Sequence, residues 1–185
     1  MTGFLERVKK RFSKNEYLVI KKAYLFARNA HKGKTRKDGK REFSHLLAVA
    51  RKLEKMNSDF ETISAGLLHD IVEDTSVTLD DIKKNFNENI VFLVDACTKI
   101  SSYKDNCLNK KKTYNKILKM GKKDDRVFRI KIIDRLHNLH TWRIFSKKKK
   151  LVFAKETLEF YVPLAERIGM LEIKNEMKMI CKKIL

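Results

Sequence analysis

The chain has 185 residues, 43% of them apolar, with one proline, six glycines and a formal net charge of +20. This composition excludes a disordered chain, and no apolar run approaches the ~18 residues that a membrane-spanning helix needs. A chain of this length forms one domain of ordinary size, and its low content of proline and glycine favours helices.

The apolar periodicity predicts helices throughout, with no strand-like alternation, internal repeat or linker. Ser58-Asp59-Phe60-Glu61 has the spacing of a capping box and opens the helix that ends in His69-Asp70. Asp124-Asp125 places acids at the start of another helix, and Pro163 is expected to bend a third because it removes a backbone donor. In chain order the expected helices cover about 15–30, 44–56, 58–70, 78–86, 88–100, 113–120, 124–145, 151–168 and 171–184.

Three polar, basic segments between these helices are interpreted as loops. The first runs from His31 to about Arg41, and the third is Lys147–Lys150. Residues 101–112 lack periodicity and are interpreted as a mobile surface segment. We therefore expect an all-α, single-domain bundle of about eight to ten helices over residues 1–185.

The cysteines and the distribution of charge suggest a location and a type of ligand. Cys97, Cys107 and Cys181 show no C-x-x-C spacing, and there is no signal-peptide pattern, so we expect reduced thiols in a cytoplasmic protein. Residues 70–95 hold seven acids against two lysines, a balance of −5, which leaves +25 on the remainder. An acidic pocket within a basic shell suits a metal site that receives a polyanionic small molecule. The alternative is that lysines simply cover solvated faces.

The segment Leu68–Thr75 contains a histidine and three carboxylates after an almost wholly apolar run. On a continuous helix, His69 would share a face with Glu73, and Asp70 would share one with Glu73 and Asp74. One interpretation is a solvated acidic helix end. The other is an adjacent His-Asp pair of metal ligands, followed one turn later by two acid/base groups.

Asp134 is the next candidate ligand because it lies inside an apolar helix, where an unpaired carboxylate is costly. It forms a polar stripe with Asn138 and Thr141, at i+4 and i+7. Neutralisation by Arg135 or Lys131 is the alternative, and we disfavour it because residues at i+1 and i−3 point substantially elsewhere.

A second histidine ligand could be His31 or His45, and spacing does not separate them. His45 begins an apolar helix, whereas His31 heads a loop rich in glycine and lysine and could cap its own helix. His137 and His140 are interpreted as surface or packing residues. The cations of the loop, which include Arg36 and Lys37, form either an ordinary solvated loop or a clamp for nucleotide phosphates.

Five motifs occur in order from about residue 20 to 180. They are His-x-Gly-x-x-Arg-Lys-x-Gly, Ser-His, Leu-Leu-His-Asp-x-Val-Glu-Asp-Thr, Asp-Arg-Leu-His-Asn and Glu-Thr-Leu-x-x-Tyr-x-Pro-Leu-Ala-Glu-Arg-Ile-Gly. This set resembles the hydrolase domain of RelA/SpoT homologues, in the HD superfamily of metal-dependent phosphohydrolases. The resemblance implies an HD-type helical bundle without a synthetase domain, and the activity of a guanosine-3′,5′-bis(diphosphate) 3′-pyrophosphohydrolase. Such an enzyme converts (p)ppGpp to GDP or GTP plus pyrophosphate.

The resemblance also implies roles for individual residues. One metal, usually Mn²⁺, would be held by His45, His69, Asp70 and Asp134. The remaining roles are activation and positioning of the attacking water by Glu73 and Asp74, binding of the guanine base and phosphates by Arg36 and Lys37, and lining of the nucleotide pocket by Asn138 and Thr141.

The chain departs from the family pattern at Leu46, where proline is usual, at Lys34, where glutamine is frequent, and at His140, where arginine is common. None of these removes a ligand, but each could shift substrate preference. The alternative functions are an HD phosphohydrolase of another nucleotide, such as one acting on the 2′-phosphate of NADPH, and a metal-free basic module that binds RNA. The RNA-binding alternative leaves Asp134 and the face formed by His69, Asp70, Glu73 and Asp74 unexplained, so we expect a guanosine polyphosphate as the partner, without a membrane and without nucleic acid.

Overall fold

The fold is all-helical in the computed structural model, which describes residues 2–36, 39 and 41–185. An isolated β-bridge joins Thr35 and Arg41 across the loop between the second and third helices. The α-helices are α1 (Thr2–Arg11), α2 (Lys14–Ala30), α3 (Glu42–Lys55), α4 (Phe60–Leu68), α5 (Ile71–Asp74), α6 (Leu79–Asn85), α7 (Glu88–Cys97), α8 (Asn106–Gly121), α9 (Arg126–His140), α10 (Lys147–Glu156), α11 (Val162–Arg167) and α12 (Leu171–Lys182).

The prediction of an all-α fold is therefore confirmed. Two pairs among these twelve segments are nearly continuous: only His69 and Asp70 separate α4 from α5, and only a π-helical turn over Thr157–Tyr161 separates α10 from α11. Counting each pair as one helix leaves ten. The π-helical turn ends two residues before Pro163, which lacks the N–H that an unbroken helix would need there.

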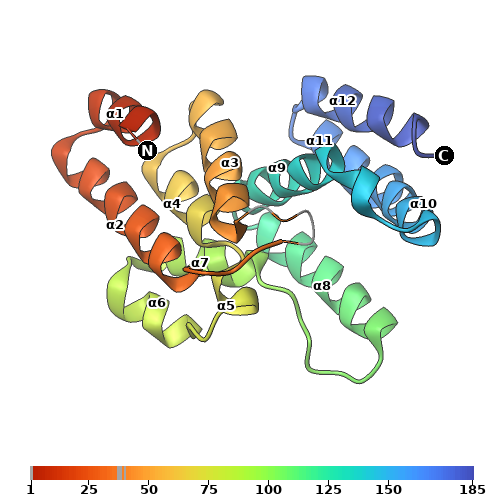
Figure 1. Ribbon diagram of the computed structural model, residues 1–185, viewed down its shortest axis with the longest axis horizontal. Helices are drawn as coiled ribbons and strands as arrows, with labels where there is room; N and C mark the ends of the chain where they lie inside the picture. The colour runs from red at the N-terminus through yellow and green to blue at the C-terminus, as the bar shows by residue number, and fades with distance from the viewer. Residues whose placement is uncertain (1, 37–38, 40) are drawn as a thin grey trace.

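The central element is α9, which contacts α3, α4, α7 and α8 as well as α11 and α12. In Figure 1 it lies between the N-terminal helices and the C-terminal group α10–α12. Its residues from Ile130 to Leu136 are all buried. Helices buried on all sides are normally apolar throughout, so the charges of α9 must find partners or ligands inside the protein.

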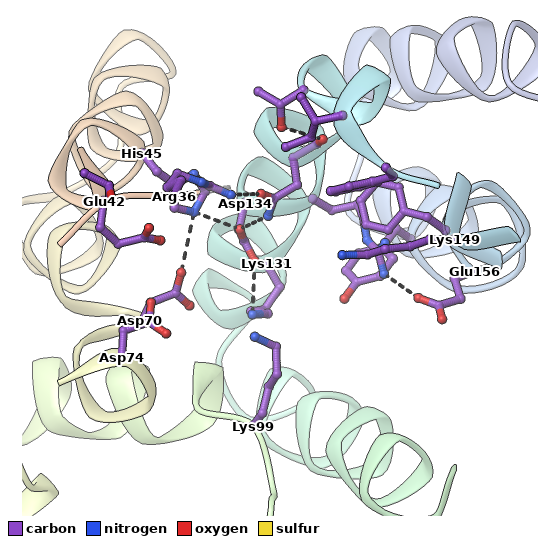
Figure 2. A pocket seen from close by; sticks show the side chains of 18 residues that line it. Arg36, Glu42, His45, Asp70, Asp74, Lys99, Lys131, Asp134, Lys149 and Glu156 are labelled. Carbon is purple, nitrogen blue, oxygen red and sulfur yellow. Dashed lines mark hydrogen bonds and ion pairs between the residues drawn. The ribbon is translucent and has the colours of Figure 1, made fainter. Parts of the chain in front are cut away.

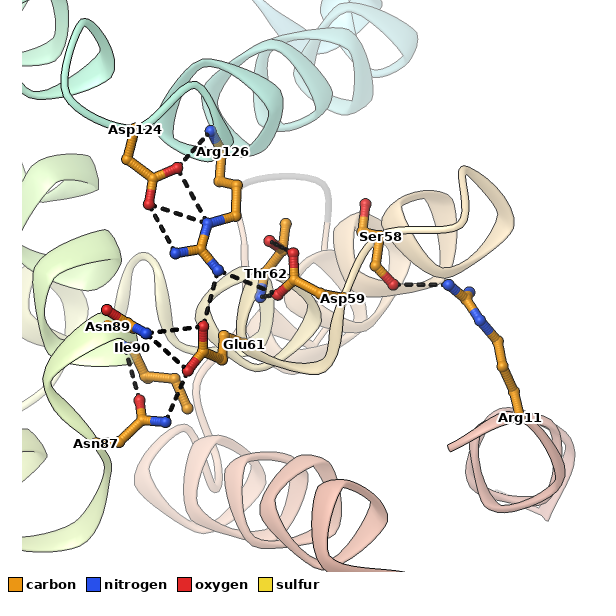
Figure 3. A network of polar contacts seen from close by, with 10 residues as sticks. All are labelled: Arg11, Ser58, Asp59, Glu61, Thr62, Asn87, Asn89, Ile90, Asp124 and Arg126. Carbon is orange, nitrogen blue, oxygen red and sulfur yellow. Dashed lines mark hydrogen bonds and ion pairs between the residues drawn. The ribbon is translucent and has the colours of Figure 1, made fainter. Parts of the chain in front are cut away.

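A polar network fixes the starts of α4, α7 and α9 relative to one another (Figure 3). Arg126 donates to Asp124 at 2.7 Å and to Glu61 at 2.8 Å. Glu61 also accepts from the side-chain amides of Asn87 and Asn89. Because the side chain of Arg126 is only 23% exposed, these bonds are partly shielded from solvent and hold the helices in one arrangement.

Two predicted loops are wrong in part. Lys147–Lys150 is the first turn of α10, because the Ser146 hydroxyl accepts from the backbone N–H of Lys149 and caps the helix. The helix predicted from residue 113 begins at Asn106, where Asp105 is the cap and accepts from the N–H of Cys107. Short polar caps outweigh the lack of apolar periodicity in both segments.

Smaller differences concern helix ends. Asp59, and not Ser58, caps α4 by accepting from the N–H of Thr62. The helix predicted to reach Phe145 ends at His140 and is followed by a 3₁₀ turn over Trp142–Ile144. In the described part of the chain, no helix combines the length and the apolar character needed to cross a membrane.

The corner between α8 and α9 generates a stability prediction. A Cβ at Gly121 would lie 2.1–2.5 Å from three ring atoms of Phe128, so Gly121→Ala should lower the free energy of unfolding by about 1–3 kcal/mol through overpacking. Gly3→Ala is the matched control, because its Cβ would meet only Nη1 of Arg7 at 3.7 Å. Urea denaturation of both variants measures the difference, and equal stability would contradict the prediction.

Candidate metal centre

Four buried side chains from separate parts of the fold converge at one point. His45 lies on α3, His69 and Asp70 lie between α4 and α5, and Asp134 lies on α9. Each offers one ligand atom, and these atoms all lie within 4.8 Å of one another. The Nε2 atom of His69 is 3.1 Å from Asp70 Oδ2, and Nε2 of His45 is 3.2 Å from Asp134 Oδ1. The four residues that the resemblance assigns to a metal are therefore brought together.

The cluster carries more negative charge than its surroundings neutralise. Burial raises the pKa of a carboxyl group, yet His69 and His45 outweigh burial and hold the pKa of Asp70 well below its usual range. Burial also opposes protonation of His69, but the carboxylates of Asp70 and Asp134 raise the pKa of this imidazole to about 10. A site that draws protons onto a buried histidine is one that a cation would stabilise.

The ring orientations of both histidines suit coordination. Nδ1 of His69 lies 2.9 Å from the carbonyl oxygen of Gly66 and donates to it, so Nε2 faces the cluster and becomes a ligand atom when a metal replaces its proton. Nδ1 of His45 is paired with Nδ1 of His137 at 2.8 Å, and burial and the neighbouring His45 lower the pKa of His137 to about 4. A neutral His137 can accept the His45 proton and fix its tautomer.

These contacts decide between the candidate histidines. His31 is buried, but its Nδ1 bonds the carbonyl of Ala27 within its own helix, and it is not in the cluster. His137 is half-buried and packs against His45, with the ring centroids 4.7 Å apart, and its hydrogen bond to His45 is a contact that the interpretation as a surface or packing residue did not include. His140 is on the surface as predicted, where it pairs with Glu176.

The donor set fits a divalent metal. Among the described residues, Nε2 of His45, Nε2 of His69 and Oδ1 of Asp70 are buried and form no hydrogen bond. Unsatisfied buried donors and acceptors are costly, so they need a ligand. Two imidazoles and two carboxylates with open positions match the mixed nitrogen and oxygen coordination of Mn²⁺, Fe²⁺ or Zn²⁺.

The second face of Asp134 is held by α9 itself. Lys131 donates to Oδ2 at 3.2 Å, and Asn138 donates to Oδ1 at 2.6 Å. The expectation that Lys131 does not neutralise Asp134 is therefore wrong. Residues three apart are neighbours on one helix face, and the long lysine side chain reaches the carboxylate. The ion pair with Lys131 does not remove Asp134 from the cluster, since its Oδ1 also lies near Nε2 of both histidines.

Glu73 and Asp74 do not lie as a continuous helix would place them. The helix is interrupted at His69-Asp70, and His69 faces His45. The Glu73 carboxylate instead accepts from the backbone N–H and from Nζ of Lys99, at 2.8 and 2.7 Å. Asp74 lines the cavity beside the cluster. Burial and the nearby Asp70 raise the pKa of its carboxyl group.

A cavity of about 550 Å³ opens over the cluster. Figure 2 shows Asp70 and Asp74 on one side, Asp134 and Lys131 on another, and Lys149 and Glu156 at the far wall. Arg36, Asn138 and Thr141 all line this cavity, as the resemblance implies for a nucleotide pocket. Lys37 lies outside the described residues.

The loop that carries Arg36 is fastened at two points. Arg36 Nη2 donates to the Asn138 side-chain oxygen at 2.6 Å, while its Nη1 is buried and has no partner among the described residues. Lys34 donates to the backbone carbonyl of Asp74. The described part of the loop therefore lies against both walls of the cavity and holds a guanidinium nitrogen that has no partner.

Six further charged residues that line the cavity were not predicted as site residues: Glu42, Lys99, Lys131, Arg135, Lys149 and Glu156. For Lys131 and Arg135 the sequence did carry a signal, since both are charges within the same apolar run as Asp134. No local signal distinguishes Glu42 or Lys99 from the many exposed charges of this chain.

Curated relatives resemble most of this chain. It is 42% identical over 159 residues to the guanosine-3′,5′-bis(diphosphate) 3′-pyrophosphohydrolase of Aquifex aeolicus, covering 86% of this chain and 23% of the relative. It is 38% identical over 161 residues to the bifunctional (p)ppGpp synthase/hydrolase SpoT of Escherichia coli K12, with the same coverage. A GTP pyrophosphokinase of Streptomyces coelicolor is 41% identical over 166 residues, covering 90% of this chain and 20% of the relative. The chain thus spans about a fifth of the length of these relatives.

The fold has a counterpart among solved structures. A metazoan ortholog of SpoT superposes with a TM-score of 0.74 at 21% identity, covering 89% of this chain and 94% of the other. At that identity the likeness concerns the fold. The HD domain family matches residues 23–171, which include all four residues of the cluster. The chain therefore belongs to the HD domain family.

Proposed function

We propose that this chain is a metal-dependent 3′-pyrophosphohydrolase that converts (p)ppGpp to GDP or GTP plus pyrophosphate. The observation that carries the proposal is the buried cluster of two histidines and two aspartates, with unsatisfied ligand atoms, at the base of a cavity whose walls carry five cations besides its acids. Polyanionic substrates match such a cavity, because the cations bind phosphates while the metal offsets charge at the reacting group.

The relatives support the choice of substrate. Two of them are named for (p)ppGpp hydrolysis, and the matched segment in this chain contains the whole cluster. The cytoplasmic location expected from the sequence belongs to the same proposal, supported by three cysteines that are free in the structure.

The reaction joins a water oxygen to the phosphorus that is attached to the ribose O3′. The bond between this phosphorus and O3′ breaks, O3′ takes up a proton, and the diphosphate leaves with the water oxygen. A bound Mn²⁺, held by His45, His69, Asp70 and Asp134, would acidify the water and offset phosphoryl charge.

The chain's own residues have separate tasks in this proposal. Asp74 faces the cavity and has a raised pKa, so it is the carboxylate that takes the proton of the attacking water. Glu73 holds Lys99 at the cavity edge through two hydrogen bonds. Arg36 and Asn138, which are bonded to each other, and Thr141 line the wall where the guanosine binds, and Lys37 belongs to the same proposed group.

Metal binding should stabilise the fold. Mn²⁺ at about 100 times its Kd should raise the free energy of unfolding by about 2.7 kcal/mol, and EDTA should reverse the gain. Asp134→Asn should abolish both this gain and Mn²⁺-dependent release of pyrophosphate from ppGpp. Asp125→Asn, on an exposed site before the same helix, is the matched control. Full metal-dependent hydrolysis by Asp134→Asn would refute the proposal.

His137 should tune the metal affinity through His45. His137→Ala removes the acceptor for His45 Nδ1, so we expect the Kd for Mn²⁺, measured by calorimetry, to rise about 10–100-fold. His140→Ala deletes an exposed imidazole three residues away and should leave this Kd unchanged. An equal effect of the two substitutions would show that His137 does not orient His45.

The two adjacent carboxylates should differ in kinetic effect. Asp74→Asn should lower kcat about 10²–10⁴-fold at saturating substrate and metal, because it removes the proton acceptor. Glu73→Gln should act mainly on KM, because it releases Lys99 while Asp74 remains. Steady-state kinetics with ppGpp separates the two, and a larger loss of kcat in Glu73→Gln would reverse these roles.

A further inference from the structure

A second cavity of about 420 Å³ adjoins the first. The two share a wall that includes Lys99, Lys131 and Arg135, so cations lie at the boundary between them. The second cavity continues away from the metal centre between α8 and α9, where Asn109, Lys110 and Thr113 line it. The proposed function assigns no part of the substrate to this second cavity.

Arg135 is built into the boundary between the cavities. Its guanidinium lies 4.1 Å from the ring centroid of Phe153 and 4.2 Å from that of Tyr161, which fixes its plane. Its Nη2 donates to Glu156 at 2.9 Å. Its Nη1 is buried and has no hydrogen-bond partner among the described residues. Because the side chain is only 8% exposed, bulk solvent does not readily supply one. A buried, oriented and unused donor of this kind indicates a missing acceptor.

The charge of the second cavity indicates that this acceptor is an anion. Glu156 is shared, because it accepts from Lys110 and from Arg135. Four cations (Lys99, Lys110, Lys131 and Arg135) and two acids (Glu73 and Glu156) line the cavity, and after Lys131 is set against its partner Asp134 in the metal centre the balance is +1. Burial and the neighbouring Arg135 also lower the pKa of Lys110, as expected where cations lack sufficient counter-charge.

We propose that the second cavity receives the outer phosphate of the diphosphate group that is cleaved, with Arg135 Nη1 and Lys110 as its donors. This inference rests on the proposed function, which places the inner phosphate at the metal centre. Lys131 bonds Asp134 in that centre and also lines the second cavity, so it spans the distance between the two phosphates. The cations of the second cavity then offset part of the charge of the departing pyrophosphate.

The arrangement makes the site selective for a diphosphate over a monophosphate. An inorganic monophosphate can occupy the metal centre but leaves Arg135 Nη1 and Lys110 unused. Inorganic pyrophosphate should therefore bind the Mn²⁺-loaded protein at least about tenfold more tightly than inorganic phosphate, as expected for one added charge-assisted hydrogen bond.

The test is calorimetry on the full chain, loaded with Mn²⁺ and dialysed free of excess metal. Lys110→Met should weaken pyrophosphate binding about tenfold and leave phosphate binding unchanged, and Arg135→Lys should act in the same direction. Lys111→Met is the matched control, because Lys111 is exposed and, unlike Lys110, does not line the cavity. Lys110 is half-buried at the cavity edge, so Lys110→Met leaves Arg135 packed on Phe153 and Tyr161.

Kinetics of Lys110→Met then separate the outer phosphate of the substrate from the free product. A raised KM for ppGpp with an unchanged inhibition constant for guanosine 5′-diphosphate 3′-monophosphate shows that the substrate occupies the cavity, whereas loss of pyrophosphate inhibition alone assigns it to the product. Equal affinity of wild type for pyrophosphate and phosphate, or loss of GDP binding in Lys110→Met, would overturn the inference. Tight pyrophosphate binding without ppGpp hydrolysis would instead uphold the cavity and refute the proposed function.

Discussion

The site depends on keeping the carboxylate of Asp134 charged inside an almost wholly buried helix. Such a group is expensive to desolvate, and burial alone would raise its pKa. Lys131 and the two histidines reverse that shift and hold the pKa of Asp134 well below its usual range. Because these partners come from α9, α3 and the end of α4, the cost of one buried charge is met only when three helices are packed together.

The break between α4 and α5 is the second constraint. α4 is buried over Thr62–Leu68, and a continuation would have carried Asp70 and Glu73 along one face. Ending the helix at Leu68 turns His69 toward His45 and sends Glu73 to Lys99. One interruption therefore places neighbouring residues of a single motif at the metal centre, at the cavity wall and at the edge of the second cavity.

Sequence patterns predicted the class of the fold and most of the candidate site, for identifiable reasons. Asp134 stood out because a charge within an apolar run is costly, whereas His31 and His45 could not be separated because their distance to Asp134 depends on tertiary packing. The pairing of Lys131 with Asp134 was not expected, because a lysine side chain reaches further along one helix face than the spacing of the backbone positions suggests. The helix at Asn106 was missed because its start depends on the Asp105 cap and not on apolar periodicity.

The net charge of +20 contributes less to the site than a few cations in fixed positions. An exposed lysine attracts an anion weakly, because water and salt screen it and its side chain is free to move. Lys131 and Arg135 are only 2% and 7% exposed, and each is held by a carboxylate and directed by packing. In that setting an unsatisfied N–H group discriminates between anions by geometry, since a ligand that cannot reach it leaves a buried donor unpaired. In the proposed function, the pairing of buried cations with Asp134 and Glu156 is thus what converts a general attraction for anions into recognition of one shape of phosphate.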